Sequence, residues 1–330
     1  MSIPAPSPAV ASVALQAVSP PAGGAWDVQG TVDQLWIHPV KSCAGLAVPS
    51  ARLLSTGLEW DRAWMVVDCE GAFVSQRELP GMALIRPALQ ADGLVLSAPG
   101  MPVLCLPLHV GGPMRRVRVW KDDVQAHDMG DVAARWFSDW AQHQPSIPTR
   151  LRSLRLVRSD PAQPRWSSLR WTRGLQVPNL FGDGFPLLVT SVASVQGLNA
   201  RLEAAGMPAV DVRRMRPNLV LAGVDEHDED RLDAVWLDAL PAISGPMLSV
   251  PLRVELALTK PCARCPVPDV NPDTGLPDAG VGKVLQTYRH DPRLDGAVTF
   301  GMNAFSATPL PPDGVFLHVG QAFGARWCFD

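Results

Sequence analysis

The sequence predicts a mainly β fold with α decoration, in which a β-barrel domain packs against an N-terminal β module. Short runs rich in Val, Leu, Ile and Trp recur along the chain, and turn residues such as Asp92-Gly93 and Asp313-Gly314 separate them. Few segments show a helical repeat. Many strands with few helices favour a β-barrel core to which helices are added.

Each expected strand is a short run of β-branched, aromatic or aliphatic residues. These runs lie at residues 34–37, 63–67, 94–96, 117–120 and 219–221. The clearest helix is expected over residues 132–142, with Asp131 as its N-cap and Val132, Trp136 and Trp140 on one face. We interpret both tryptophans as packing residues.

A second helix begins at Ser191 or Ser194 in this interpretation. Its inward face carries Val195, Leu198 and Leu202, and Gly206 ends it because glycine accepts the backbone conformation of a helix C terminus. A third, shorter helix is expected over residues 282–288.

Composition divides the chain into three parts. Residues 1–28 are rich in Ala, Pro and Ser and carry almost no charge, so we expect a disordered extension. The Arg- and Pro-rich stretch at residues 145–178 predicts a boundary between an N-terminal β module, residues 29–150, and a catalytic barrel, residues 151–330.

The same composition limits location and partners. No basic residue precedes the apolar stretch at residues 9–18, and no apolar run reaches the ~20 residues of a membrane span. The net charge of −3 gives no basic face for nucleic acid. Six scattered cysteines are not typical of a secreted disulfide scaffold. We therefore expect a cytoplasmic protein without a membrane span or a nucleic-acid partner.

The most informative motif is a Cys-x-x-Cys pair, Cys262 and Cys265. The cations Lys260 and Arg264 favour thiolate there, and an Asn-Pro-Asp-Thr-Gly turn follows at residues 271–275. A tetrahedral zinc site needs further ligands that the spacing does not supply. Two prolines after the pair oppose the helix of a thioredoxin-like site. A functional pair and a buried inert pair remain as alternatives.

These motifs resemble the signature of the MOSC-domain family, and within it the amidoxime-reducing branch with its bacterial relatives. Pro-Cys-Ala-Arg-Cys at residues 261–265 and Val-Asn-Pro-Asp-Thr-Gly at 270–275 carry the resemblance. Three further stretches match in the family's order: Val-Lys-Ser-Cys at 40–43, Asp-Arg-Ala-Trp-Met-Val-Val at 61–67, and Arg-Pro-Asn-Leu-Val-Leu at 216–221.

The resemblance implies a molybdenum cofactor, a pterin dithiolene that ends in phosphate. It assigns Cys265 as the metal ligand, and soft thiolate suits such a metal. It also implies that the cofactor is bound by Lys41, Ser42, Arg62, Arg216, Asn218 and Arg264. Taken singly, Lys41 and Arg62 could be surface charges, and Asn218 could serve only the backbone of an edge strand.

Asp183 matches an acidic residue near the metal in that branch. Its carboxylate could hold a basic N-hydroxylated substrate or help to move a proton. The alternative is a Gly-Asp-Gly turn at residues 182–184 without a chemical role.

The resemblance implies an oxidoreductase that reduces N-hydroxylated compounds, namely amidoximes, hydroxylamines and N-hydroxylated bases. The spacing of the cysteines offers no iron–sulfur site, so electrons would come from a separate redox protein. The alternative is a sulfur carrier or sulfurtransferase that holds a persulfide on Cys265.

Overall fold

A computed structural model of the chain describes residues 25–109, 112–145, 147–242, 251–278 and 280–329. Its described part contains 21 strands and three α-helices, which confirms the mainly β prediction. None of the helices in these ranges has the length and apolar character needed to span a lipid bilayer.

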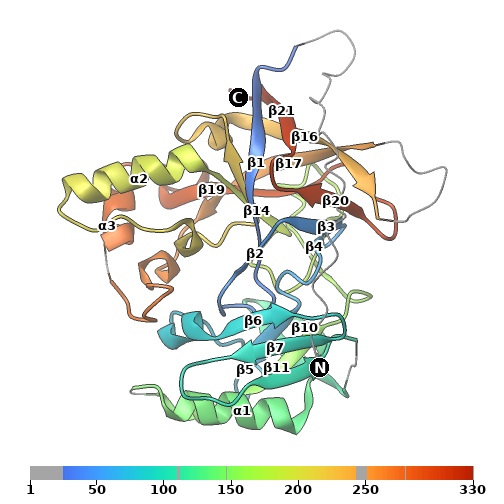
Figure 1. The fold of residues 1–330 in the computed structure, drawn as a ribbon, viewed down its shortest axis with the longest axis vertical. Helices are drawn as coiled ribbons and strands as arrows, with labels where there is room; N and C mark the ends of the chain where they lie inside the picture. Colours follow the sequence, from blue (N-terminus) through green and yellow to red (C-terminus); the bar gives the residue numbers. More distant parts are fainter. Residues whose placement is uncertain (1–24, 110–111, 146, 243–250, 279, 330) are drawn as a thin grey trace, which may run out of the picture.

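Seven strands form a closed barrel in the upper half of Figure 1. Their order around the barrel is β17-β19-β14-β15-β1-β21-β16, and pairing of β16 with β17 closes it. Only β14 and β15 run parallel. The strands are β1 (Val28–Ile37), β14 (Leu187–Ser191), β15 (Leu219–Ala222), β16 (Leu232–Pro241), β17 (Leu252–Ala263), β19 (Ala297–Ser306) and β21 (Ala322–Trp327).

Aliphatic side chains on the inward faces of these strands form one core. Val32, Leu221 and Leu256 are all fully buried in it. Burial along β1 and β16 broadly alternates, as expected for strands with one face on a core. Five short strands extend the barrel sheet: β2 pairs with β1, β18 pairs with β19, and β20, β3 and β4 continue in that order from β16. Their bounds are β2 (Leu46–Val48), β3 (Ser50–Leu54), β4 (Gly57–Leu58), β18 (His290–Asp291) and β20 (Val315–His318).

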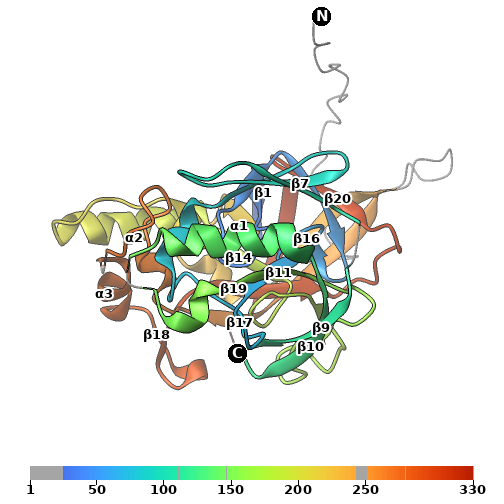
Figure 2. The ribbon, with the colours of Figure 1, turned by 90° about the horizontal axis from the view of Figure 1, so that it is seen from below.

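A second module lies below the barrel in Figure 1. Its four-stranded sheet has the order β5-β11-β10-β9, and its three-stranded sheet has the order β6-β7-β8. Figure 2 shows α1 (Gly130–Gln142) lying across this module. The strands are β5 (Trp64–Val67), β6 (Arg86–Leu89), β7 (Gly93–Ser97), β8 (Leu104–Pro107), β9 (Met114–Val119), β10 (Asp122–Asp128) and β11 (Arg155–Ser159).

Strand pairing joins segments from both sides of residue 150. β1 belongs to the barrel and β11 to the four-stranded sheet, so each module contains a segment from the other side of residue 150. Of the expected extension, residues 1–24 lie outside the described residues. Trp26 is 7% exposed and stacks on Trp236 with ring centroids 5.2 Å apart, so packed structure begins before residue 29.

The first helix differs from its prediction in two respects. It begins at Gly130, whose backbone N–H donates to Asp128, so Asp131 lies in the first turn and is not the N-cap. Val132 is 60% exposed, although Trp136 and Trp140 are buried. Four-residue steps drift by about 40° each on a 3.6-residue helix, and this drift carries Val132 off the buried face.

The other helices follow the prediction more closely. In α2 (Val192–Ala204), Ser191 is the N-cap and its Oγ accepts from the N–H of Ser194 at 3.0 Å. Gly206 ends the segment with a φ of 71°. The third helix, α3 (Gly280–Gln286), begins and ends two residues earlier than expected. A short two-stranded sheet joins β12 (Arg165–Trp166) and β13 (Pro178–Asn179).

Candidate functional site

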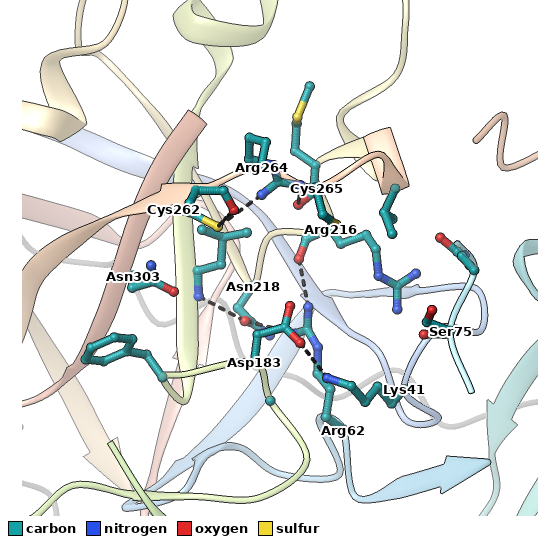
Figure 3. Close-up of a pocket in the computed structure, with 18 of the residues that line it drawn as sticks. Lys41, Arg62, Ser75, Asp183, Arg216, Asn218, Cys262, Arg264, Cys265 and Asn303 are labelled. Atoms are coloured by element: carbon teal, nitrogen blue, oxygen red, sulfur yellow. Dashed lines mark hydrogen bonds and ion pairs between the residues drawn. The ribbon is translucent and has the colours of Figure 1, made fainter. Parts of the chain in front are cut away.

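One pocket collects every site residue that the sequence predicts. They come from the loop after β1, the segment before β5, the loop before β14, the segment before β15 and the end of β17. Figure 3 shows most of them pointing toward a common space. The predicted residues that line the pocket are Lys41, Ser42, Arg62, Asp183, Arg216, Asn218, Arg264 and Cys265.

Arg62 is held in place by several acceptors. Its Nη1 donates to both carboxylate oxygens of Asp61, at 2.8 and 2.6 Å, and to Oδ1 of Asn218 at 3.1 Å. Its Nη2 donates to the carbonyl of Arg216 at 2.9 Å. Asp61 in turn accepts from the backbone N–H of His38 at 2.7 Å. The guanidinium is therefore fixed in the wall of the pocket.

Asn218 connects several strands at the base of the pocket. Its Oδ1 accepts from Leu188 N–H as well as from Arg62, and its Nδ2 donates to the carbonyl of Trp36 at 3.1 Å. The side chain is 1% exposed. These bonds give Asn218 a positioning role for Arg62, and direct contact with a cofactor stays a prediction.

Arg216 lies beside Arg62. Its Nη1 donates to the carbonyl of Cys43 at 2.6 Å. Burial and the nearby Arg62 charge lower the pKa of Arg216 to about 10. Two adjacent guanidinium groups repel each other, so this part of the pocket favours an anionic ligand that lies near both.

Lys41 and Asp183 form an ion pair at the pocket wall. Nζ of Lys41 donates to Oδ1 of Asp183 at 2.5 Å and to the carbonyl of Phe181 at 2.8 Å. Burial lowers the pKa of Lys41, and Asp183 opposes that shift. Packing against the pocket wall raises the pKa of Asp183, but the charge and hydrogen bond of Lys41, with the Arg62 charge, together outweigh this and hold the pKa well below its usual range. Asp183 is therefore an anion at neutral pH.

The two thiols differ in their surroundings. Cys265 is exposed at the pocket, whereas Cys262 is partly buried. Nη1 of Arg264 lies 3.2 Å from Sγ of Cys262, and its Nη2 donates to the carbonyl of Met215 at 3.0 Å. Arg264 thus contacts Cys262 and leaves Cys265 open to the pocket.

Strained backbone is concentrated around this pocket. Among described residues other than glycine, eight have a positive φ, and four of those eight line the pocket. The left-handed conformation costs an L-residue roughly 1–2 kcal/mol, and such strain clusters at functional sites. The four are Ser42 (70°), Arg62 (47°), Trp120 (57°) and Arg216 (55°).

The charges of the lining residues fit the cofactor that the sequence predicts. Five cationic side chains and two carboxylates line the pocket, together with two thiols. A pterin dithiolene with a terminal phosphate is anionic and needs cationic donors as well as a soft metal ligand. The residues present can supply both.

Four further lining residues lie outside the predicted set: Phe73, Arg77, Trp120 and Asn303. No motif marks them, because their place at the pocket depends on how the two modules pack. Asp61 is also outside that set, although its position directly before Arg62 in a matched motif is a signal in the sequence.

Two domain families match the chain. A model described as the MOSC N-terminal beta barrel domain matches residues 29–144, and a model described as the MOSC domain matches residues 176–318.

Several curated proteins with related sequences are named amidoxime-reducing components. Mitochondrial amidoxime-reducing component 1 of Mus musculus is 33% identical over 269 residues, covering 79% of this chain and 72% of that protein. Its Homo sapiens counterpart is 33% identical over 261 residues, covering 75% and 68%. Mitochondrial amidoxime reducing component 2 of Bos taurus is 31% identical over 267 residues, covering 79% and 72%. A solution structure of a Bordetella bronchiseptica protein is 28% identical and covers 30% of this chain and 72% of its own, with a TM-score of 0.26.

Proposed function

Because the chain belongs to the MOSC-domain family that includes the mitochondrial amidoxime-reducing components, we propose that it is a molybdenum-cofactor oxidoreductase acting on N-hydroxylated compounds. The observation that carries the proposal is that eight residues, which the family resemblance assigns from five stretches of the chain, line one cationic pocket. Amidoximes, hydroxylamines and N-hydroxylated bases are the proposed substrates.

The residues divide into a metal end and an anionic end in this proposal. Cys265 supplies the protein thiolate, because it is exposed to the pocket and free of the Arg264 contact that Cys262 makes. Arg62 and Arg216 bind the pterin and its phosphate with Lys41 and Ser42, and Arg264 orients the cysteine motif. When bound, the molybdenum cofactor would supply a centre that exchanges two electrons.

In this proposal Asp183 would bind the substrate and Lys41 would hold a proton beside it. Reduction of an N–OH group to N–H consumes two electrons and two protons and releases water. Asp183 is ionised at neutral pH, so it would accept hydrogen bonds from the N–H groups of a basic substrate rather than donate a proton. The Lys41 ammonium, 2.5 Å from that carboxylate, holds a proton at the same wall.

We further propose that a separate redox protein delivers the electrons and that no nucleic acid takes part. The cytoplasmic location expected from the sequence remains a prediction, as does the division into residues 29–150 and 151–330.

Metal analysis and turnover of the purified full chain test the proposal together. We expect about one molybdenum and one pterin per chain, and reduction of benzamidoxime to benzamidine with reduced viologen as donor. A protein that carries a persulfide on Cys265, contains no molybdenum and does not reduce N–OH groups would instead support the sulfur-carrier function.

A further inference from the structure

Trp120 occupies an unfavourable backbone position at the mouth of the pocket. Asp122 pairs with Val119, so Trp120 and Lys121 form the two-residue loop between β9 and β10. The φ of Trp120 is 57°. Positive φ at the first position of such a loop is dominated by Gly, Asn and Asp. A bulky aromatic residue there indicates that the side chain is needed where this backbone places it.

Several contacts fix the indole ring against the pocket. Its Nε1 donates to Oδ1 of Asp183 at 3.2 Å. The Phe73 ring meets it nearly edge to face, with centroids 4.8 Å apart at 64°. The guanidinium of Arg77 lies 4.6 Å from its centroid. Even so, Trp120 remains 42% exposed, so these contacts leave much of the ring free for a ligand.

The wall combines an aromatic surface with an available acceptor. Both rings line the pocket that also contains Cys265. Oδ1 of Asp183 is occupied by Lys41 and Trp120, whereas Oδ2 has no hydrogen-bond donor among the described residues. A flat ligand with a conjugated ring at one end and N–H donors at the other would satisfy both features.

We propose that Trp120 and Phe73 form an aromatic wall that selects aryl amidoximes over aliphatic ones. The inference rests on the proposed reduction of N-hydroxylated compounds and names the substrate class within it. In this arrangement the ring of the substrate packs on the wall, and its amidine-like nitrogens donate to Oδ2 of Asp183. The wall comes from the β5-β11-β10-β9 module and its adjoining loops, whereas Cys265 follows barrel strand β17, so substrate selection and metal ligation lie on different modules.

Binding of the two product amidines tests the wall without turnover. Benzamidine carries the ring, and acetamidine presents the same nitrogens without it. Calorimetry on the holoenzyme should show that Trp120→Leu weakens benzamidine binding roughly threefold to tenfold, the range of an aromatic contact. Acetamidine binding should change equally in Trp120→Leu and Trp120→Phe, because both variants lose the same Nε1 hydrogen bond to Asp183. Trp120→Phe should keep most of the affinity for benzamidine because it retains an aromatic ring.

Trp166→Leu is the matched control, because Trp166 is 58% exposed and is not among the pocket residues. It should bind both amidines as the wild type does. In turnover with reduced viologen, Trp120→Leu should raise KM for benzamidoxime more than it raises KM for acetamidoxime.

Two results would overturn the aromatic wall: unchanged benzamidine affinity in Trp120→Leu, or an equal loss for benzamidine and acetamidine. Failure of the proposed function has a different signature. In that case benzamidine binding depends on Trp120, yet the wild type reduces neither amidoxime. Melting temperatures of all variants are measured alongside, and Trp120→Phe tests the wall if Trp120→Leu does not fold.

Discussion

Nζ of Lys41 lies 2.5 Å from Oδ1 of Asp183, yet the two side chains differ sharply in exposure, at 7% for the lysine and 74% for the aspartate. The buried cation therefore depends on a carboxylate that water can reach. Because the solvent also stabilises the carboxylate, loss of the pair affects Lys41 more than Asp183.

The Asp183→Asn variant should make stability depend on pH through Lys41. Burial lowers the folded-state pKa of Lys41 and Asp183 raises it, so the variant lowers that pKa further. Between this value and the unfolded pKa of about 10.4, the unfolded chain binds more protons, and the free energy of unfolding rises with pH. Urea unfolding from pH 7 to 10 should show a steeper rise in the variant than in the wild type. The double variant Asp183→Asn with Lys41→Met should lose this added dependence of the free energy of unfolding on pH. Parallel pH profiles for Asp183→Asn and the wild type would contradict the coupling of Lys41 to Asp183.

Removal of Arg62 should destabilise the fold as well as the cofactor site. Asp61 is buried, and Arg62 donates to both of its carboxylate oxygens, one of which also accepts from the backbone N–H of His38. Breaking a buried pair from one side typically costs about 3–5 kcal/mol. We expect Arg62→Ala to lose free energy of unfolding in that range by denaturant titration, and Asp61→Asn with Arg62→Ala to regain part of it. An Arg62→Ala protein as stable as the wild type would show that Asp61 does not need its partner.

The two cysteines should respond differently to substitution. Cys265→Ala should lose bound molybdenum and reductase activity while keeping its melting temperature, because Cys265 is exposed and pairs with no side chain in the described part of the chain. Cys262→Ala should retain most of its molybdenum, since the Cys262 thiol contacts the Arg264 guanidinium and is not the proposed metal ligand. Molybdenum content per chain, measured on both variants expressed side by side, decides the assignment. Equal loss in the two would reject Cys265 as the sole ligand.

A buried carboxyl group away from the pocket predicts a second pH effect. Glu229 is fully buried against Ser191 and Ser194, and loss of water and the nearby Asp230 raise its pKa to about 7. The folded chain therefore binds more protons than the unfolded chain between about pH 4.5 and 7. Its free energy of unfolding should fall with rising pH across that window, by up to about 1.4 kcal/mol per pH unit. Glu229→Gln keeps the hydrogen-bond acceptor and should lack this decrease when unfolding is measured from pH 4.5 to 8.

Turnover should depend on the electron donor. The sequence has no Gly-x-Gly-x-x-Gly motif after a strand and no iron–sulfur spacing. The purified chain should reduce benzamidoxime with reduced viologen and remain nearly inactive with NADH until a reductase and a small electron carrier are added. Rapid NADH-driven turnover by the isolated chain would reveal a nucleotide or flavin site.

Local sequence predicted the elements whose signals are local. Of the two expected helix starts, Ser191 and Ser194, the N-cap is Ser191, and Gly206 ends the segment as expected, because capping acts within one helical turn. The prediction of Asp131 as N-cap was wrong because the helix already begins at Gly130, where the Asp128 carboxylate accepts from the first N–H.

Features that depend on long-range packing were not visible in the sequence. The amide of Asn218 bonds to residues from three distant segments, which no spacing rule could identify. Trp120 ended an expected strand, and only the β9–β10 pairing places it in a turn with positive φ. Ordered motifs located the pocket, whereas its aromatic wall emerged only from the packing of the two modules.

Closure of the barrel has a consequence for synthesis on the ribosome. Val28 of β1 pairs with Ala325 of β21, and β21 also pairs with β16. At roughly 5–20 residues per second, the ribosome needs roughly 15–60 s between making these two partners. During that interval a nascent chain exposes one unpaired edge on β1 and another on β16, both open to pairing with other chains. The β5-β11-β10-β9 sheet is complete by Ser159, so it can form on the nascent chain long before the barrel closes.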